Sequence, residues 1–158
     1  MLATSMLRQS TPKIMKKLLL TLLLIPTLVL AQKTPRGETY DTQILRVSDG
    51  DTIVISARFL PAPLKPELAV RIYGVDTPEK GHRAQCPSEA QRGEAASAWT
   101  KQLIASGTRF QVTLYAWDKF GGRVLGDILV DGRSVRAGLI QNGFAREYYG
   151  DAKQSWCN

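Results

Sequence analysis

Alternating apolar positions begin at Tyr40 and predict a β-rich first half of the chain. Two runs of apolar and β-branched residues flank Asp49-Gly50, a pair that is typical of a tight hairpin turn. The runs are Ile44, Leu45 and Val47 before the turn and Ile53, Val54 and Ile55 after it. Three prolines between residues 59 and 68 predict a stiff loop that interrupts the sheet, and residues 69–75 resume it as a third strand.

Helical spacing replaces the alternation after Pro87. Ser88 is expected to cap the helix N-terminus, with Gln91 three residues further on. An apolar stripe at helical spacing then predicts the face that packs on the core. Its members are Ala95, Ala98, Trp99, Leu103 and Ile104. Gly107 suits the C′ position that follows a helix.

The rest of the chain predicts two more strands and a short helix. Residues 110–117 and 123–130 alternate as strands. Ser134 is expected to cap a short helix that stops at Gly143. Three strands, a helix and two further strands follow the order of the OB fold. We therefore expect an α+β domain, a five-stranded OB-fold β-barrel with two to three short helices.

The first 31 residues have the pattern of a signal peptide. Lysines at positions 16 and 17 precede an apolar run of 13 residues, and small residues permit cleavage after Ala31. The run is shorter than the roughly 20 residues of a membrane-spanning helix, although an uncleaved anchor is the alternative. The sequence thus predicts a signal peptide over 1–31, a polar leader over 32–39, and a periplasmic or secreted domain over 40–158.

Export changes what the charge of the chain implies. The 158 residues carry 21 lysines and arginines against 14 acids, a formal net charge of +7. Four of these bases and none of the acids fall in residues 1–31, which leaves +3 on the mature domain. Such a mildly basic charge permits nucleic-acid binding without requiring it.

Cys86 and Cys157 are the two cysteines, and both follow the expected signal peptide. A pair of cysteines in an oxidising compartment predicts a disulfide, with two unpaired thiols as the alternative. A zinc site is disfavoured because two cysteines and the single histidine, His82, are too few ligands for a closed site. We expect the side chain of His82 to be solvated.

Three short segments concentrate acids and arginines. They are Asp49-Gly50-Asp51-Thr52, residues 71–79 and residues 118–123. Each has a simpler interpretation when taken alone: a hairpin turn, a helix cap with proline at its first position, and a glycine-rich loop.

Together, these segments supply the parts for phosphodiester hydrolysis. Asp51 and Asp76 offer hard oxygen ligands at strand ends, as Ca²⁺ prefers. Glu79 follows Asp76 by three residues and is suited to orient or deprotonate a water. Arg71 and Arg123 are planar, always charged and able to bind a phosphate diester with two donors.

The motifs resemble the staphylococcal nuclease (thermonuclease) family. The matching stretches, in order, are residues 49–52, 71–79, 93–98, 118–123 and 131–143. The resemblance runs from about Tyr40 to Tyr149. It implies Ca²⁺-dependent hydrolysis of DNA and RNA, with products that end in a 3′-phosphate.

Carried over by position, the resemblance implies a role for each of eight residues. The catalytic residues are Arg71, Glu79 and Arg123, the Ca²⁺ ligands are Asp51, Asp76 and the backbone carbonyl of Thr77, and the substrate contacts are Lys119 and Tyr149. Phe120 departs from the family pattern, which has a tyrosine there. The turn before Arg123 is also one residue longer because of Gly121-Gly122.

Two other functions fit parts of this pattern. An OB-fold module that binds single-stranded nucleic acid without cleaving it needs a basic groove and aromatic residues, but not all five charged side chains together. An exported structural domain would use the two aspartates for a stabilising Ca²⁺. The sequence has no signal for oligomerisation, so we expect a monomer without a membrane partner after signal removal.

Overall fold

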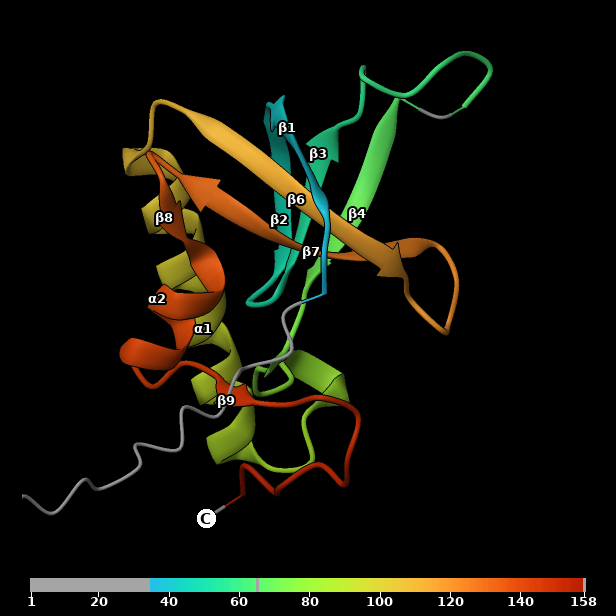
Figure 1. Cartoon of the computed structure of the whole chain (residues 1–158). Coiled ribbons are helices and arrows are strands. Elements are labelled where there is room, and N and C mark those ends of the chain that lie inside the picture. The colour runs from blue at the N-terminus through green and yellow to red at the C-terminus, as the bar shows by residue number, and fades with distance from the viewer. Residues whose placement is uncertain (1–34, 65, 158) are drawn as a thin grey trace, which may run out of the picture. The chain divides into compact units, whose positions relative to one another are not determined.

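The computed structural model describes residues 35–64 and 66–157 (Figure 1). The strands are β1 (Glu38–Thr42), β2 (Ile44–Asp49), β3 (Thr52–Ser56), β4 (Glu67–Ile72), β5 (Val75–Asp76), β6 (Phe110–Trp117), β7 (Arg123–Val130), β8 (Arg133–Ser134) and β9 (Arg146–Glu147). The helices are the 3-10 turn η1 (Gly81–Arg83), α1 (Pro87–Ser106) and α2 (Val135–Gln141). The expected signal peptide lies outside the described residues. Within them, no helix is long and apolar enough to cross a membrane.

The main sheet has the order β1-β6-β7-β4-β3-β2, and β8 adds to β7. β4 and β7 run parallel, whereas the other neighbours pair antiparallel. β1 and β2 lie at opposite ends of this order, yet only Gln43 separates them along the chain. Both edges of the sheet therefore belong to one segment, as expected of an OB fold.

The α+β class is confirmed, and the five expected strands correspond to β1–β2 taken together, β3, β4, β6 and β7. The first strand is divided at Gln43, and the register of β2 against β3 shifts between Ile44 and Arg46 and again between Val47 and Asp49. Such irregularities bend a strand, so one segment can pair with β6 at one end and β3 at the other. α1, with 20 residues, covers the stretch between Pro87 and Gly107 that the sequence predicts as helical, and it is the one described helix that is not short.

Alternation within the strands decides which side chains form the core. Ile53 and Ile55 of β3, and Val70 and Ile72 of β4, are at most 1% exposed. Burial of each such side chain contributes about 1.5–3 kcal/mol relative to an exposed one. Because successive side chains point to opposite faces of a strand, the burial of Val70 and Ile72 turns Arg71 away from the core.

α1 packs on the strands through small and polar residues, not through the whole of the expected apolar stripe. Ala95 and Ala98 are exposed, which corrects their assignment to the core. The other three members pack against the core: Trp99, Leu103 and Ile104. The buried residues are Glu89, Gly93, Ala96, Ser97 and Thr100.

The reason for this small, polar face is a close approach to the β2–β3 turn. A Cβ atom on Gly50 would lie 3.0 Å from Cβ of Ala96. Thr100 Oγ1 donates a hydrogen bond of 2.8 Å to the Gly50 carbonyl. Larger apolar side chains would hold the helix away from the turn, so the apolar pattern alone could not indicate this face.

The ends of α1 also differ from expectation. Pro87 is the first helical residue, where its fixed φ angle is favourable, so Cys86 is the N-cap and Ser88 lies inside the helix. Gly107 is the C-cap with an ordinary φ of −87° rather than a left-handed C′ residue. A glycine is still required there, because a Cβ atom would overlap the side chain of Val130.

α2 begins and ends as the sequence predicts. Ser134 is its N-cap, and Ser134 Oγ accepts a hydrogen bond of 3.0 Å from the Ala137 N–H. Gly143, which follows the C-cap, has the left-handed φ of 72° that glycine tolerates best.

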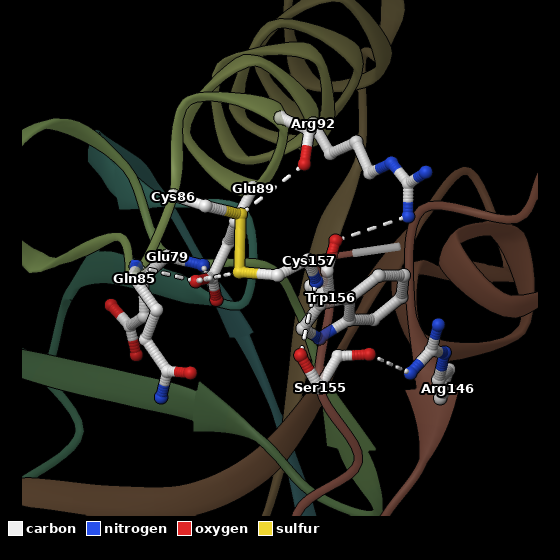
Figure 2. The surroundings of a disulfide bond; sticks show 10 residues. Glu79, Gln85, Cys86, Glu89, Arg92, Arg146, Ser155, Trp156 and Cys157 are labelled. Atoms are coloured by element: carbon white, nitrogen blue, oxygen red, sulfur yellow. Dashed lines mark hydrogen bonds between the residues drawn. A yellow bond between two sulfur atoms is a disulfide. The ribbon is translucent and has the colours of Figure 1, made fainter.

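A disulfide joins Cys86 to Cys157, whose Cα atoms lie 5.9 Å apart (Figure 2). The prediction of a pair is thereby confirmed. The bond fastens the C-terminal segment, which is red in Figure 1, to the N-cap of α1. It closes a loop of 71 positions along the chain.

Replacement of both cysteines by serine should lower the free energy of unfolding by up to about 4 kcal/mol, the chain-entropy value for a loop of this length. Urea denaturation of the oxidised protein and of the Cys86→Ser/Cys157→Ser variant measures the difference. A variant as stable as the oxidised protein would show that the bond adds no constraint to the fold.

Candidate functional site

A cleft of about 680 Å³ opens where the ends of β2, β4 and β6 meet the C-terminal segment. Its charged lining residues are Asp49, Asp51, Arg71, Glu79, Arg83, Asp118, Lys119, Arg123 and Lys153. Its aromatic lining residues are Tyr73, Trp117, Phe120, Tyr148 and Tyr149. Seven of the eight expected site residues line the cleft. Asp76, the eighth, is 5% exposed and adjoins the lining residues Val75 and Thr77.

Both aspartates that we expect to bind the metal, Asp51 and Asp76, are buried. Asp51 lies in the β2–β3 turn, is 8% exposed, and accepts a 3.0 Å hydrogen bond from Thr52 Oγ1. Asp76 ends the short strand β5, whose pairing with β9 fixes its backbone. Thr77 follows directly and is also buried. The structure therefore brings the three expected metal-ligating residues to one end of the sheet.

The two carboxylate oxygens of Asp76 meet two groups from the C-terminal segment. Oδ2 accepts a hydrogen bond of 3.0 Å from the indole N–H of Trp156. Oδ1 lies 2.6 Å from Lys153 Nζ, yet it is buried and accepts no hydrogen bond of good geometry. The positive charge of Lys153, rather than a hydrogen bond, balances this oxygen.

Burial raises the pKa of Asp51 above its ordinary value, because removal from water disfavours the ionised carboxylate. Arg71, whose Nε lies 3.7 Å from Asp51 Oδ2, opposes this rise, as does the hydrogen bond from Thr52. The negative charges of Asp49 and Glu79 add to it. Asp51 is thus a desolvated carboxylate that the nearby cations only partly compensate.

Glu79 combines an anchored backbone with an accessible side chain. Its carboxylate is 37% exposed and lies 3.5 Å from Arg83 Nε and 4.0 Å from Lys153 Nζ. Its N–H donates to Glu89 Oε1 at 3.2 Å. Gly93 of α1 approaches its carbonyl so closely that a Cβ atom there would overlap it. A partly exposed carboxylate held in this way at the cleft is suited to act on a water molecule.

The parallel β4–β7 ladder places the two arginines on one face of the sheet. Ala69 is the partner of Arg123 in this ladder, and Arg71 follows Ala69 by two positions. Residues two positions apart share a face of a strand. Arg71 and Arg123 therefore both project into the cleft, as their place in its lining confirms.

The longer turn before Arg123 keeps this residue at the cleft. Gly121 and Gly122 take left-handed φ values of 71° and 70°, and the Asp118 N–H closes the turn on the Arg123 carbonyl at 3.0 Å. The Arg123 guanidinium reaches Asp118 Oδ2 through Nη2 at 2.7 Å and through Nε at 3.0 Å. Asp118 is buried and thus orients the guanidinium.

The donor set fits a hard divalent cation. Asp51, Asp76 and the Thr77 carbonyl supply oxygen atoms, and none of the described residues that line the cleft is a cysteine or histidine. The buried Asp76 Oδ1 without a hydrogen bond is the clearest sign of such a ligand position. Among the described residues, however, no three carboxylates of the cleft have oxygens that all lie within 4.8 Å of one another. In this arrangement Lys153 lies against Asp76 Oδ1.

The cysteines and the histidine do not form a zinc-ligand set in the described part of the chain. His82 is exposed in η1 and does not line the cleft. Ligand atoms of Cys86, Glu89 and Cys157 lie within 4.8 Å of one another, but the two sulfurs are bonded to each other and provide no thiolate. The expectation of a solvated His82 is confirmed.

Comparison with known proteins agrees with this geometry. The pattern of the family described as "Staphylococcal nuclease homologue" matches residues 69–156, more than half of the chain. The chain belongs to the staphylococcal nuclease family. The match begins within β4, two residues before Arg71, and includes α1, α2 and the segment that carries Lys153 and Trp156.

Three curated relatives of this nuclease family come from Bacillus subtilis (strain 168). Endonuclease YhcR is 30% identical over 125 residues, which cover 75% of this chain and 10% of the relative. The SPbeta prophage-derived endonuclease YokF is 33% identical over 114 residues, or 71% and 36% of the two chains. Endonuclease YncB is 35% identical over 106 residues, or 66% and 46%. The chain thus spans less than half the length of each relative.

The sequence analysis gave no role to four residues of the site, which are Asp49, Arg83, Lys153 and Trp156. Asp49 stands beside Asp51 in the first motif and pairs with Arg83, so the doubled aspartate was the signal that could have found it. Lys153 and Trp156 lie in a segment without periodicity. The position of Trp156 next to Cys157 was the one available signal, because a disulfide restrains its neighbours.

Gly93→Ala tests how closely α1 supports the Glu79 backbone. Alanine is favoured over glycine inside a helix by about 1 kcal/mol. The overlap with the Glu79 carbonyl should outweigh this gain, because overpacking costs typically 1–3 kcal/mol. We expect Gly93→Ala to lower the urea midpoint, whereas the exposed control Gln91→Ala leaves it within error. A more stable Gly93→Ala protein would contradict the close approach.

Proposed function

We propose that this chain is an exported, Ca²⁺-dependent nuclease that hydrolyses phosphodiester bonds of DNA, RNA or both and leaves 3′-phosphate ends. The observation that carries the proposal is the convergence of two arginines, one accessible glutamate and the buried Asp51 on one cleft, with the buried Asp76 next to its lining. Membership of the staphylococcal nuclease family and three relatives named as endonucleases support it.

The arginines bind and stabilise the reacting phosphate. Arg71 and Arg123 reach the cleft from neighbouring strands, so their planar donors can hold two oxygens of one phosphodiester. Asp118 and Asp51 orient them in advance, which lowers the reorganisation needed when charge develops on the phosphate oxygens.

Glu79 acts on the attacking water. Its carboxylate accepts a proton from water as the water oxygen forms a bond to phosphorus. The bond from phosphorus to the 5′-oxygen breaks, and that oxygen takes up a proton and leaves as a hydroxyl. The phosphate then remains on the 3′ side. Lys119 and Tyr149 line the same cleft and are placed to contact the rest of the substrate.

Asp51, Asp76 and the Thr77 carbonyl are the groups that would hold Ca²⁺. When bound, the ion polarises the phosphate and neutralises part of its charge. The expected signal peptide and the Cys86–Cys157 disulfide support export, since disulfides persist in oxidising compartments. We propose that the exported protein acts as a monomer.

A non-catalytic module that binds single strands is the second candidate. Trp117 and Phe120, both more than 70% exposed, flank Lys119 at the β6–β7 hairpin. Exposed aromatic rings next to a basic side chain stack on unpaired bases. Such a module would bind nucleic acid in the presence of chelator and would not cleave it under any condition, which separates it from the nuclease.

Calcium removal should abolish hydrolysis. The desolvated carboxylates of Asp51 and Asp76 supply hard oxygens and no soft ligand accompanies them. We expect cleavage of single- and double-stranded DNA and of RNA with Ca²⁺, loss of cleavage in excess chelator, and recovery when Ca²⁺ is restored. Full activity in excess chelator would exclude the metal assignment.

Arg71→Lys and Arg123→Lys should each lower turnover about 10²-fold or more. Lysine keeps the charge but loses the rigid, two-pronged donor, and one donor aimed at a transition state is worth on the order of 10²–10³ in rate. Turnover with saturating substrate and Ca²⁺ measures the effect.

The matched control is Arg46→Lys, an exposed arginine that pairs with Glu67 away from the cleft. Its turnover should stay within about twofold, and melting temperatures of all three variants should remain close to that of the unmodified protein. Near-normal turnover of Arg123→Lys would remove this arginine from the mechanism.

A further inference from the structure

The C-terminal segment of residues 148–157, which we call the tail, contains no helix or strand but is firmly held. Its first residue is fixed by a hydrogen bond of 3.1 Å from the Tyr148 N–H to the Gly74 carbonyl. Its last described residue, Cys157, is bonded to Cys86. Between these two anchors the tail passes along the cleft, where Tyr148 and Lys153 belong to the lining.

Trp156 is the buried residue of the tail, with 7% of its surface exposed. The Arg146 guanidinium lies 3.8 Å from the centre of the indole ring. Arg92 of α1 donates to the Trp156 carbonyl at 3.2 Å, and Arg146 donates to the Ser155 carbonyl at 2.9 Å (Figure 2). With the adjacent disulfide, these contacts restrain the backbone at Ser155 and Trp156 and place the Arg146 guanidinium over the indole.

The indole N–H is directed at a carboxylate oxygen of the cation site. It donates to Asp76 Oδ2 at 3.0 Å, and both residues are buried. An indole nitrogen can only donate, so this bond occupies Oδ2 of Asp76. Oδ1 is thereby left for a cation. Hydrogen bonds of this kind to ligating carboxylates raise metal affinity by orienting the ligand.

Lys153 meets the other oxygen of the same carboxylate. Its Nζ lies 2.6 Å from Asp76 Oδ1 and 4.0 Å from Glu79 Oε1. The Lys153 side chain is 47% exposed, so it can leave this position for solvent without unpacking the core. An ammonium group and a divalent cation cannot both lie against one carboxylate oxygen, because they repel each other.

We propose that the tail is part of the cation site, with Trp156 as a positioning residue for Asp76 and Lys153 as the ammonium that a divalent cation displaces. The proposal rests on the Ca²⁺ dependence proposed above and names residues that tune it. The two residues act on one carboxylate in opposite directions. Loss of the indole N–H weakens cation binding, whereas loss of the ammonium strengthens it.

Calorimetric titration with Ca²⁺, in the absence of nucleic acid, tests both residues without relying on activity. Trp156→Phe removes the N–H and keeps an aromatic ring, and Ca²⁺ should bind at least about tenfold more weakly. Lys153→Met removes the charge and keeps the length of the side chain. Ca²⁺ should then bind up to about fivefold more tightly, as expected for the loss of a half-exposed ion pair.

Two controls separate a positioning role from a general loss of stability. Trp99→Phe alters a tryptophan of α1 that packs against Phe144, away from Asp76, so it lowers stability without touching the site. Lys101→Met removes an exposed charge from the same helix. Both controls should bind Ca²⁺ as the unmodified protein does, at a temperature where every variant is folded by circular dichroism.

The outcomes distinguish this inference from the proposed function. If the unmodified protein binds Ca²⁺ but Trp156→Phe and Lys153→Met match their controls, the tail has no part in the site and the inference is wrong. If both variants weaken binding, Lys153 supports the site and does not compete with the ion, which also overturns it. If the unmodified protein binds no Ca²⁺, the proposed metal and this inference fail together. Should Trp156→Phe not fold, Lys153→Met alone decides, since tighter binding supports displacement and unchanged binding refutes it.

Discussion

The parallel pairing of β4 with β7 is the contact on which the cleft depends. Antiparallel neighbours can be joined by a short turn, but parallel strands need a long crossover. Here the crossover contains β5, η1, α1 and β6, so it carries Asp76, Thr77 and Glu79 from the end of β4 to the supporting helix. The same pairing sets Arg71 and Arg123 on one face. The β4–β7 pairing thus places the proposed phosphate-binding arginines, and the crossover that it requires contains Asp76 and Glu79.

The strands and most of the charged residues that line the cleft could be predicted because they depend on local signals. Alternation located the five long strands, and the sequence Asp49-Gly50-Asp51 marked both a turn and a proposed metal ligand. Prediction of a helix from its apolar stripe and its N-cap residue assumes that the helix packs through large apolar side chains and begins at a polar residue. α1 violates both assumptions, because its neighbours are the backbones of Gly50 and Glu79 rather than the core alone. The tail could not be predicted either, since its position depends on a disulfide and on contacts with residues far away in the sequence.

The polar face of α1 holds the acidic loops through hydrogen bonds. The buried Glu89 accepts hydrogen bonds from the N–H groups of Glu79 at 3.2 Å and Gln85 at 2.7 Å. Ser97 donates to Asp49 Oδ1 at 3.4 Å. These hydrogen bonds satisfy backbone and side-chain groups that would otherwise be buried without partners, which is costly in a medium of low dielectric constant. The helix therefore stabilises the geometry of the site more than it extends the apolar core.

Burial of the Asp51 carboxylate opposes folding at neutral pH, and a bound cation and the disulfide are the two sources of stability that offset it. The raised pKa of Asp51 means that the folded state binds a proton more tightly than the unfolded chain does. The contribution of Asp51 to stability therefore falls as the pH rises above its unfolded value, and at neutral pH its ionised form is unfavourable. A cation that binds only the folded state returns stability by mass action, about 2.7 kcal/mol at a hundred times its dissociation constant. The disulfide contributes up to about 4 kcal/mol whether or not a cation is present. The Cys86–Cys157 disulfide adjoins Trp156, which donates to Asp76. It can thus help to keep the desolvated carboxylates in place before the proposed Ca²⁺ binds, as a preorganised metal site requires.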